Sequence, residues 1–193
     1  MRTEYSNWRK LDNAALAFPL VTGENDTRVF RFYCQLKEEV DSDILQQALD
    51  RTMEKYPLFQ AVLRKGLFWF YLEHSHIRAL VKPETEPPCS RLYIPDKKSL
   101  LFQVSYYKER INFEVFHALT DGTGAMHFLQ ELVQNYLILA HPKENFPEIG
   151  RDKKTGRGNI EEDSFSQYYS SDIPKNREKK KAAVKLKGEK LVH

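Results

Sequence analysis

Residues 113–126 read Phe-Glu-Val-Phe-His-Ala-Leu-Thr-Asp-Gly-Thr-Gly-Ala-Met, and this stretch decides both the expected fold and the candidate site. The alternation up to His117 predicts a strand that carries Phe113, Val115 and His117 on one face. His117 is then an imidazole that projects from the end of an otherwise apolar strand face. This position makes it a candidate general base.

The residues after His117 are expected to turn the chain from this strand into a helix. Asp121 can cap the first turn of the helix or pair with an arginine. Gly122 and Gly124 are expected to supply backbone freedom for the turn. A purely structural role for His117 remains open at this point, because a histidine at the end of a strand often donates a hydrogen bond to a backbone carbonyl. Asp121 and the glycines could likewise serve only the loop.

Hydrophobic periodicity on both sides of this stretch predicts the remaining elements. Period-two alternation predicts strands over 28–37, 59–65, 67–74, 99–107 and 111–117, and the last four pair as two hairpins. Helical spacing predicts one helix between Asp41 and Pro57 and another between Asp121 and Pro142. Residues 8–22 predict a short helix or turn followed by an extended segment, and residues 82–98 a proline-rich loop. The order β-α-β-β-β-β-α predicts an α+β fold, with a mostly antiparallel sheet and helices on one face.

Composition indicates one folded domain and a basic tail. The chain has 193 residues, of which 41% are hydrophobic and 30% charged, as is typical of globular proteins. Aromatic residues end before position 170, and lysines crowd residues 175–190. We therefore expect a core domain over 1–145 and a basic linker over 146–193, which should be extended or mobile from about residue 150 onward. A basic run can also bind RNA, anionic lipid or a nucleotide phosphate. The aromatic residues are not interleaved with a basic groove, so no nucleic-acid partner is predicted.

Several other classes of protein are not indicated by the sequence. Cys34 and Cys89 have no metal-ligand spacing, and no disulfide framework is expected, which fits a cytoplasmic protein. Residues 1–10 lack the apolar region of a signal peptide, and no apolar run is long enough to span a bilayer. His74 and His76 share a strand face, but no third ligand is evident nearby, so no metal site is predicted.

The pattern His-x-x-x-Asp-Gly, formed here by His117, Asp121 and Gly122 between a strand and a helix, resembles the signature of the chloramphenicol acetyltransferase-like superfamily. That superfamily includes the condensation domains of peptide synthetases and the alcohol O-acetyltransferases. The order of the predicted elements before the motif is also similar to that of the family. The resemblance covers roughly residues 5–140.

Three other segments carry the same resemblance. Residues 8–12 followed by 17–19 (Trp-Arg-Lys-Leu-Asp and Ala-Phe-Pro) look like the opening segment of the family. Residues 41–57 look like its first helix with the Tyr-Pro that ends it. Residues 64–69 (Arg-Lys-Gly-Leu-Phe-Trp) resemble the alcohol O-acetyltransferase branch in particular. One departure is Phe116, which stands where many relatives carry the first of two histidines.

The resemblance implies a CoA-dependent acyltransferase that forms no covalent enzyme intermediate. His117 would take the proton from an alcohol or amine acceptor, which then attacks the thioester of acyl-CoA. Asp121 would be structural and is often paired with an arginine in relatives; Arg64 is the candidate here. Gly122 would let the loop bend beside the substrate tunnel. Acyl-CoA is expected as a co-substrate, with no permanently bound cofactor.

Relatives have a second domain of similar fold, and their active site lies in the channel between the two. Residues 146–193 resemble the crossover into that domain. The chain is therefore expected to be an N-terminal half that is nearly inactive alone and that works with a second acyltransferase domain or a second copy. The alternatives are a non-catalytic interaction module, a truncated relic of the fold, and a fragment of a peptide-synthetase condensation domain.

Overall fold

The structure is a computed structural model that describes residues 8–10, 17–23, 26–67, 69–95 and 97–146. In chain order the elements are β1 (Trp8–Lys10), α1 (Ala17–Val21), β2 (Val29–Gln35), α2 (Ser42–Lys55), the short 3-10 helix η1 (Pro57–Phe59), β3 (Ala61–Lys65), β4 (Phe70–His74), β5 (Lys82–Pro83), β6 (Phe102–Tyr107), β7 (Arg110–Phe116) and α3 (Gly122–Ala140).

The strands form two sheets. The larger has the order β2-β7-β6-β5; β7 is antiparallel to both β2 and β6, whereas β5 runs parallel to β6. The smaller has the order β1-β4-β3 and is antiparallel throughout. A single bridge between Val62 in β3 and Leu100, which lies just before β6, links the two sheets.

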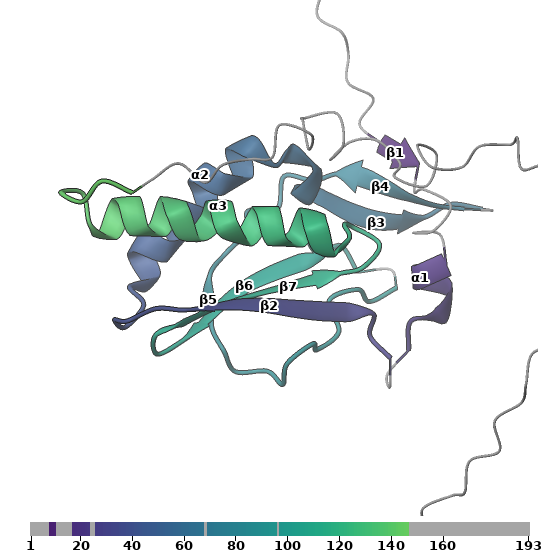
Figure 1. Ribbon diagram of the computed structural model, residues 1–193. Helices are drawn as coiled ribbons and strands as arrows, with labels where there is room; N and C mark the ends of the chain where they lie inside the picture. The colour runs from purple at the N-terminus through teal and green to yellow at the C-terminus, as the bar shows by residue number, and fades with distance from the viewer. Residues whose placement is uncertain (1–7, 11–16, 24–25, 68, 96, 147–193) are drawn as a thin grey trace, which may run out of the picture.

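Helices α2 and α3 lie side by side on one face of the larger sheet, and the long segment between β5 and β6 crosses the opposite face (Figure 1). Stacked aromatic rings fill the layer between helices and sheet. Phe128 of α3 packs on Phe113 of β7, with 4.7 Å between ring centroids, and on Phe59, at 4.4 Å. All three side chains are buried, and burying a side chain of this size stabilises a fold by about 1.5–3 kcal/mol.

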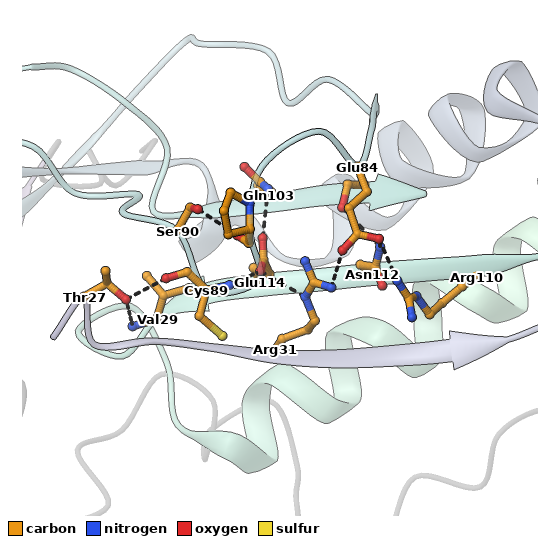
Figure 2. A network of polar contacts seen from close by, with 12 residues as sticks. Thr27, Val29, Arg31, Glu84, Cys89, Ser90, Gln103, Arg110, Asn112 and Glu114 are labelled. Carbon is orange, nitrogen blue, oxygen red and sulfur yellow. Dashed lines mark hydrogen bonds and ion pairs between the residues drawn. The ribbon is translucent and has the colours of Figure 1, made fainter. Parts of the chain in front are cut away.

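The opposite face of the larger sheet carries buried charges instead of aromatic rings (Figure 2). Arg31 of β2 lies between two carboxylates, Glu84 at 2.5 Å and Glu114 of β7 at 3.0 Å. Arg110 pairs with Glu84 at 2.6 Å, and the backbone N–H of Cys89 donates to Glu114 at 2.6 Å. These contacts fasten the segment that follows β5 onto the sheet, because each buried charge has a partner of opposite sign or a hydrogen bond.

The predicted α+β class is confirmed, and the structure is mostly antiparallel with both long helices on one face of the larger sheet. The two hairpins and both long helices are also confirmed. Residues 8–22 were predicted in the wrong order, since strand β1 precedes helix α1. The predicted loop 82–98 begins with β5, a strand of two exposed residues that is too short to show hydrophobic alternation.

Residues 147–193 lie outside the described ranges, so the basic tail expected over 146–193 is untested. The division into a domain over 1–145 and this tail therefore remains a proposal. None of the helices in the described ranges is both long enough and apolar enough to cross a membrane.

Candidate active site

His117 lies directly after β7, where the chain leaves the larger sheet. Its backbone N–H donates to the carbonyl of Arg28 at 2.9 Å, which continues the β2–β7 ladder by one step. Arg28 has a φ of 52°, an uncommon conformation for a residue with a side chain, and it also pairs with Asp26 at 2.8 Å. The position of His117 is thus fixed by the sheet on one side and by a specific turn before β2 on the other.

The His117 imidazole is half-buried between two phenylalanine rings. Phe18 of α1 stacks on it with 4.5 Å between ring centroids and 13° between the ring planes. Phe30 of β2 lies at 4.9 Å with a tilt of 56°. Among the residues that the structure describes, neither ring nitrogen of His117 has a hydrogen-bond partner. A backbone carbonyl that satisfies the ring, the structural explanation left open by the sequence, is therefore not seen in the described ranges.

Asp121 is the N-cap of α3. Its side chain accepts a hydrogen bond from the backbone N–H of Gly124 at 2.8 Å, and its carbonyl accepts from Ala125 at 3.0 Å. The carboxylate is exposed and is aimed along the first turn of the helix. Capping, one of the two predicted roles of Asp121, is confirmed. It satisfies a backbone N–H that has no partner within the helix.

The prediction that Arg64 pairs with Asp121 is wrong. The Nε atom of Arg64 lies 3.0 Å from Glu73 on the neighbouring strand β4, so its charge is already balanced across the hairpin. Asp121 takes part in no ion pair within the described ranges.

The predicted reason for the glycines also needs correction. Neither Gly122 nor Gly124 has a positive φ, so backbone freedom does not explain them. Gly122 is the first residue of α3, and a Cβ there would meet Phe32 at an ordinary 4.0 Å. A Cβ at Gly124, in contrast, would lie 2.1 Å from Oγ1 of Thr120. The steric demand for glycine therefore falls on Gly124, because the turn after His117 folds tightly against the helix.

Phe116, the departure from the resembled family noted in the sequence, is fully buried on the opposite face of the sheet from His117. It stacks on Tyr93 with 5.6 Å between centroids. A side chain at this position lies on the other face of the sheet and does not contact the His117 ring. Phe116 thus helps to pack the segment between β5 and β6 onto the sheet.

No group of three residues able to hold a metal ion occurs in the described ranges. His74 and His76, the pair noted in the sequence, lie edge to face at 5.5 Å. Cys34 and Cys89 are free thiols, and burial raises the pKa of both.

An apolar groove of about 380 Å³ lies between α3 and the edge strand β2. Its walls are formed by Tyr33, Cys34, Met126, Leu129, Gln130, Val133, Gln134, Leu137 and Phe146. The groove is next to the C-terminal half of β2, whereas Phe30 and the His117 ring lie at the other end of that strand. It is therefore separate from the candidate site.

The sequence indicated His117, Asp121 and Gly122 as candidate site residues, and the structure brings all three to the turn between β7 and α3. It did not identify the two aromatic rings on either side of the imidazole. Phe30 could have been found, because its position in a strand that pairs with β7 puts it near the strand end. Phe18 could not, because no periodic pattern relates α1 to β7.

Comparisons with known proteins agree with this fold. No protein-family profile matches the chain, and no curated protein sequence matches it. The starter condensation domain of rhizomide synthetase RzmA is similar in structure, with a TM-score of 0.59 and 12% identity over 74% of this chain and 40% of that chain. The tallysomycin biosynthesis protein TlmII has a TM-score of 0.54 and 14% identity over 76% of this chain and 44% of that chain.

Polyketide synthase associated protein 5 from Mycobacterium tuberculosis is also similar, with a TM-score of 0.54 and 18% identity over 74% of this chain and 36% of that chain. At such identities the likeness shows the fold alone. The chain has the fold seen in part of these three proteins, and it covers less than half the length of each of them.

Proposed function

We propose that this chain is the half of an acyltransferase that carries His117. The enzyme moves an acyl group, which we propose is acetyl, from a CoA thioester to an alcohol or amine. The observation that carries the proposal is the His117 imidazole, which is held at a strand end while its ring nitrogens have no partner in the described ranges. An imidazole in this state is able to accept a proton from a bound reactant. The fold supports the same chemistry, since similar structures are condensation domains.

The reaction balances without a covalent enzyme intermediate. One ring nitrogen of His117 takes the proton from the acceptor hydroxyl or amine, whose lone pair attacks the thioester carbonyl. The carbon–sulfur bond then breaks, and the sulfur of CoA leaves with the electron pair. The imidazolium returns its proton to that sulfur, so His117 ends the cycle neutral and the products are an ester or amide and free CoA.

Asp121 and Gly122 have supporting roles in this proposal. Asp121 caps α3 and thereby holds the turn that follows His117. Gly122 presents no side chain at the start of α3, which leaves room for the substrate beside the imidazole. Neither residue is proposed to exchange a proton with the reactants.

Acyl-CoA is proposed as the donor and no permanently bound cofactor is required. One structure of the RzmA starter condensation domain, at 12% identity and a TM-score of 0.59, is described as a complex with C8-CoA. This supports a CoA thioester as donor. The resemblance of residues 64–69 to alcohol O-acetyltransferases favours an alcohol acceptor, and a cytoplasmic location would supply the acyl-CoA.

The chain offers only one wall of the proposed channel. A transfer between two substrates needs both of them and the base held in one water-poor site, because positioning supplies much of the rate. We therefore propose that a second domain of similar fold, or a second copy, completes the site, and that residues 146–193 form the crossover.

A second candidate function is a non-catalytic interaction module. It is favoured by another similar structure, the complex of the X-domain and OxyB from teicoplanin biosynthesis, with a TM-score of 0.57 and 13% identity over 76% of this chain. In that candidate the same fold serves to bind a partner protein. A peptide-synthetase condensation fragment would differ from both in taking a carrier-bound acyl group.

The test measures acyl transfer from acetyl-CoA to a panel of alcohols and amines, with the chain alone and mixed with a separately expressed second half. His117→Ala should reduce the rate at least about 100-fold, since general-base catalysis supplies that much or more. His76→Ala, at an exposed histidine of the same chain, is the matched control. Circular dichroism checks that both variants fold. If His117→Ala keeps more than about a tenth of the rate, the base is another group.

A further inference from the structure

Phe18 and His117 form the closest aromatic contact at the candidate site, and their ring planes are almost parallel. We propose that Phe18 is a positioning residue, which together with Phe30 holds the His117 imidazole in the orientation needed to meet the acceptor. This inference rests on the proposed function, because it concerns how the proposed base is aimed.

A catalytic imidazole is commonly oriented by a hydrogen bond at one ring nitrogen, which leaves the other to react. The described residues provide no such bond to His117. Its backbone is fixed through Arg28, but that contact leaves the side chain free to rotate. The two phenylalanines are in a position to restrict this rotation, because one covers a face of the ring and the other meets it at an angle from β2. Stacking thus takes the place of the missing hydrogen bond.

Phe18 is itself held in place by local contacts. The hydroxyl of Thr22 donates to the carbonyl of Phe18 at 2.7 Å, and the backbone N–H of Thr22 donates to the same oxygen at 3.1 Å. The next residue, Pro19, is buried. Phe30 is fixed independently, because it pairs with Val115 within the β2–β7 ladder. Two elements that are distant from β7 in sequence therefore converge on one side chain.

The arrangement provides a matched control on the same short helix. Leu20 is two positions from Phe18 and 74% exposed, so its substitution changes α1 without touching His117. Phe18→Leu keeps an apolar side chain of similar size and removes the ring. Phe18→Tyr keeps the ring and should therefore preserve the stacking.

The first measurement is NMR of the full chain and does not depend on activity. In the unmodified protein we expect the ring protons of His117 to be shielded by the Phe18 ring and its χ1 couplings to report one rotamer. In Phe18→Leu the ring protons should move downfield and the couplings should become averaged. Phe18→Tyr and Leu20→Ala should retain the original values. Averaged couplings in the unmodified protein, or couplings unchanged in Phe18→Leu, would overturn the positioning role.

The second measurement is kinetic and uses the completed enzyme. Phe18→Leu should lower kcat by about 10- to 100-fold while KM stays nearly constant, since small misplacements of a reacting group have effects of that size. Phe18→Tyr should keep most of the kcat of the unmodified protein. A Phe18→Leu variant with unchanged kcat would contradict the inference. If instead His117→Ala leaves transfer intact, the proposed function fails, and the NMR result still decides whether the rings hold the imidazole. Should Phe18→Leu not fold, Phe18→Met with the same readouts replaces it.

Discussion

Gly124 lies so close to Thr120 that a Cβ added to the glycine would be 2.1 Å from the threonine Oγ1. The turn after His117 is therefore packed against the first turn of α3. Thr120 cannot easily yield, because its Cβ carries two heavy atoms and a rotation that removes one tends to bring in the other. Gly122, the other glycine at the start of α3, has no neighbour that close.

We predict that Gly124→Ala destabilises the protein by about 1–3 kcal/mol, the usual cost of overpacking. Gly122→Ala should be tolerated, since its Cβ meets only ordinary contacts. Thermal unfolding of the two variants measures the difference. The double variant Thr120→Ala with Gly124→Ala should recover most of the loss. Equal melting temperatures for both single variants would show that the turn adjusts without strain.

Asp121→Ala should lower stability by about 0.5–2 kcal/mol, because it removes the acceptor for the Gly124 N–H at the start of α3. Asp121→Asn is the matched control, since its side-chain oxygen can accept the same bond. Chemical denaturation gives both values. Activity of the completed enzyme should fall with stability in Asp121→Ala. If activity disappears in Asp121→Asn while the fold is unchanged, the carboxylate has a chemical role.

Arg31, Glu84, Arg110 and Glu114 form a network of ion pairs on the face of the larger sheet opposite the helices. This network should make the stability of the protein depend on pH. Burial alone would raise the pKa of Glu84, but the hydrogen bonds and charges of Arg31 and Arg110 outweigh it and hold this pKa below its ordinary value. The stabilisation is then fully present above the pKa of the unfolded chain. It is lost as the pH falls through the lower pKa of the folded chain.

Glu84→Gln should therefore be less stable than the unmodified protein at neutral pH, and its stability should decline less steeply under acid. Melting temperatures between pH 7 and about pH 2 measure this. Glu86→Gln, at an exposed carboxylate nearby, should follow the unmodified protein throughout. Parallel curves for Glu84→Gln and the unmodified protein would mean that another carboxylate carries the pH dependence.

Two large apolar side chains are exposed on the β3–β4 hairpin, namely Leu67 at 93% and Trp69 at 51%. Exposed apolar patches commonly mark contacts with other chains. We expect the chain alone to associate with itself in analytical ultracentrifugation and to transfer little acyl group. Leu67→Ser should weaken the association, whereas Lys65→Ser on the same hairpin should not. A monomer with full transferase activity would contradict the expectation that the chain is one half of an enzyme.

The long helices and the hairpins could be predicted because each depends on local periodicity and local signals. Asp41 caps α2 through hydrogen bonds to the N–H groups of Asp43 and Ile44, as a sequence pattern of this kind predicts. The short elements could not be predicted. Strand β5 has two residues and is defined by its pairing with β6, and α1 contacts the site through the stacking of Phe18 on His117, which no local pattern indicates.

The residues of the candidate site could be selected from the sequence, but the contacts that hold them in place could not. His117 and Asp121 belong to a local motif, so one pass along the chain reveals them. The steric role of Gly124 depends on the side chain of Thr120, which a pattern of glycines does not indicate. The pairing of Arg64 with Glu73 depends on the register of β3 and β4. Such contacts are decided by three-dimensional neighbours and stay hidden in a linear pattern.

The pairing of β2 with β7 joins residues that are far apart in the sequence. Arg31 and Glu114, for example, are 83 positions apart. The β3–β4 and β6–β7 hairpins close over short distances and can form early, whereas the β2–β7 ladder has to wait for a long loop to close. During synthesis on the ribosome, β2 emerges long before its partner and remains an unpaired strand until β7 follows. We therefore expect the contacts of Phe18 and Phe30 with His117 to be among the last in the domain to form. Until then β2 has to avoid pairing with other strands.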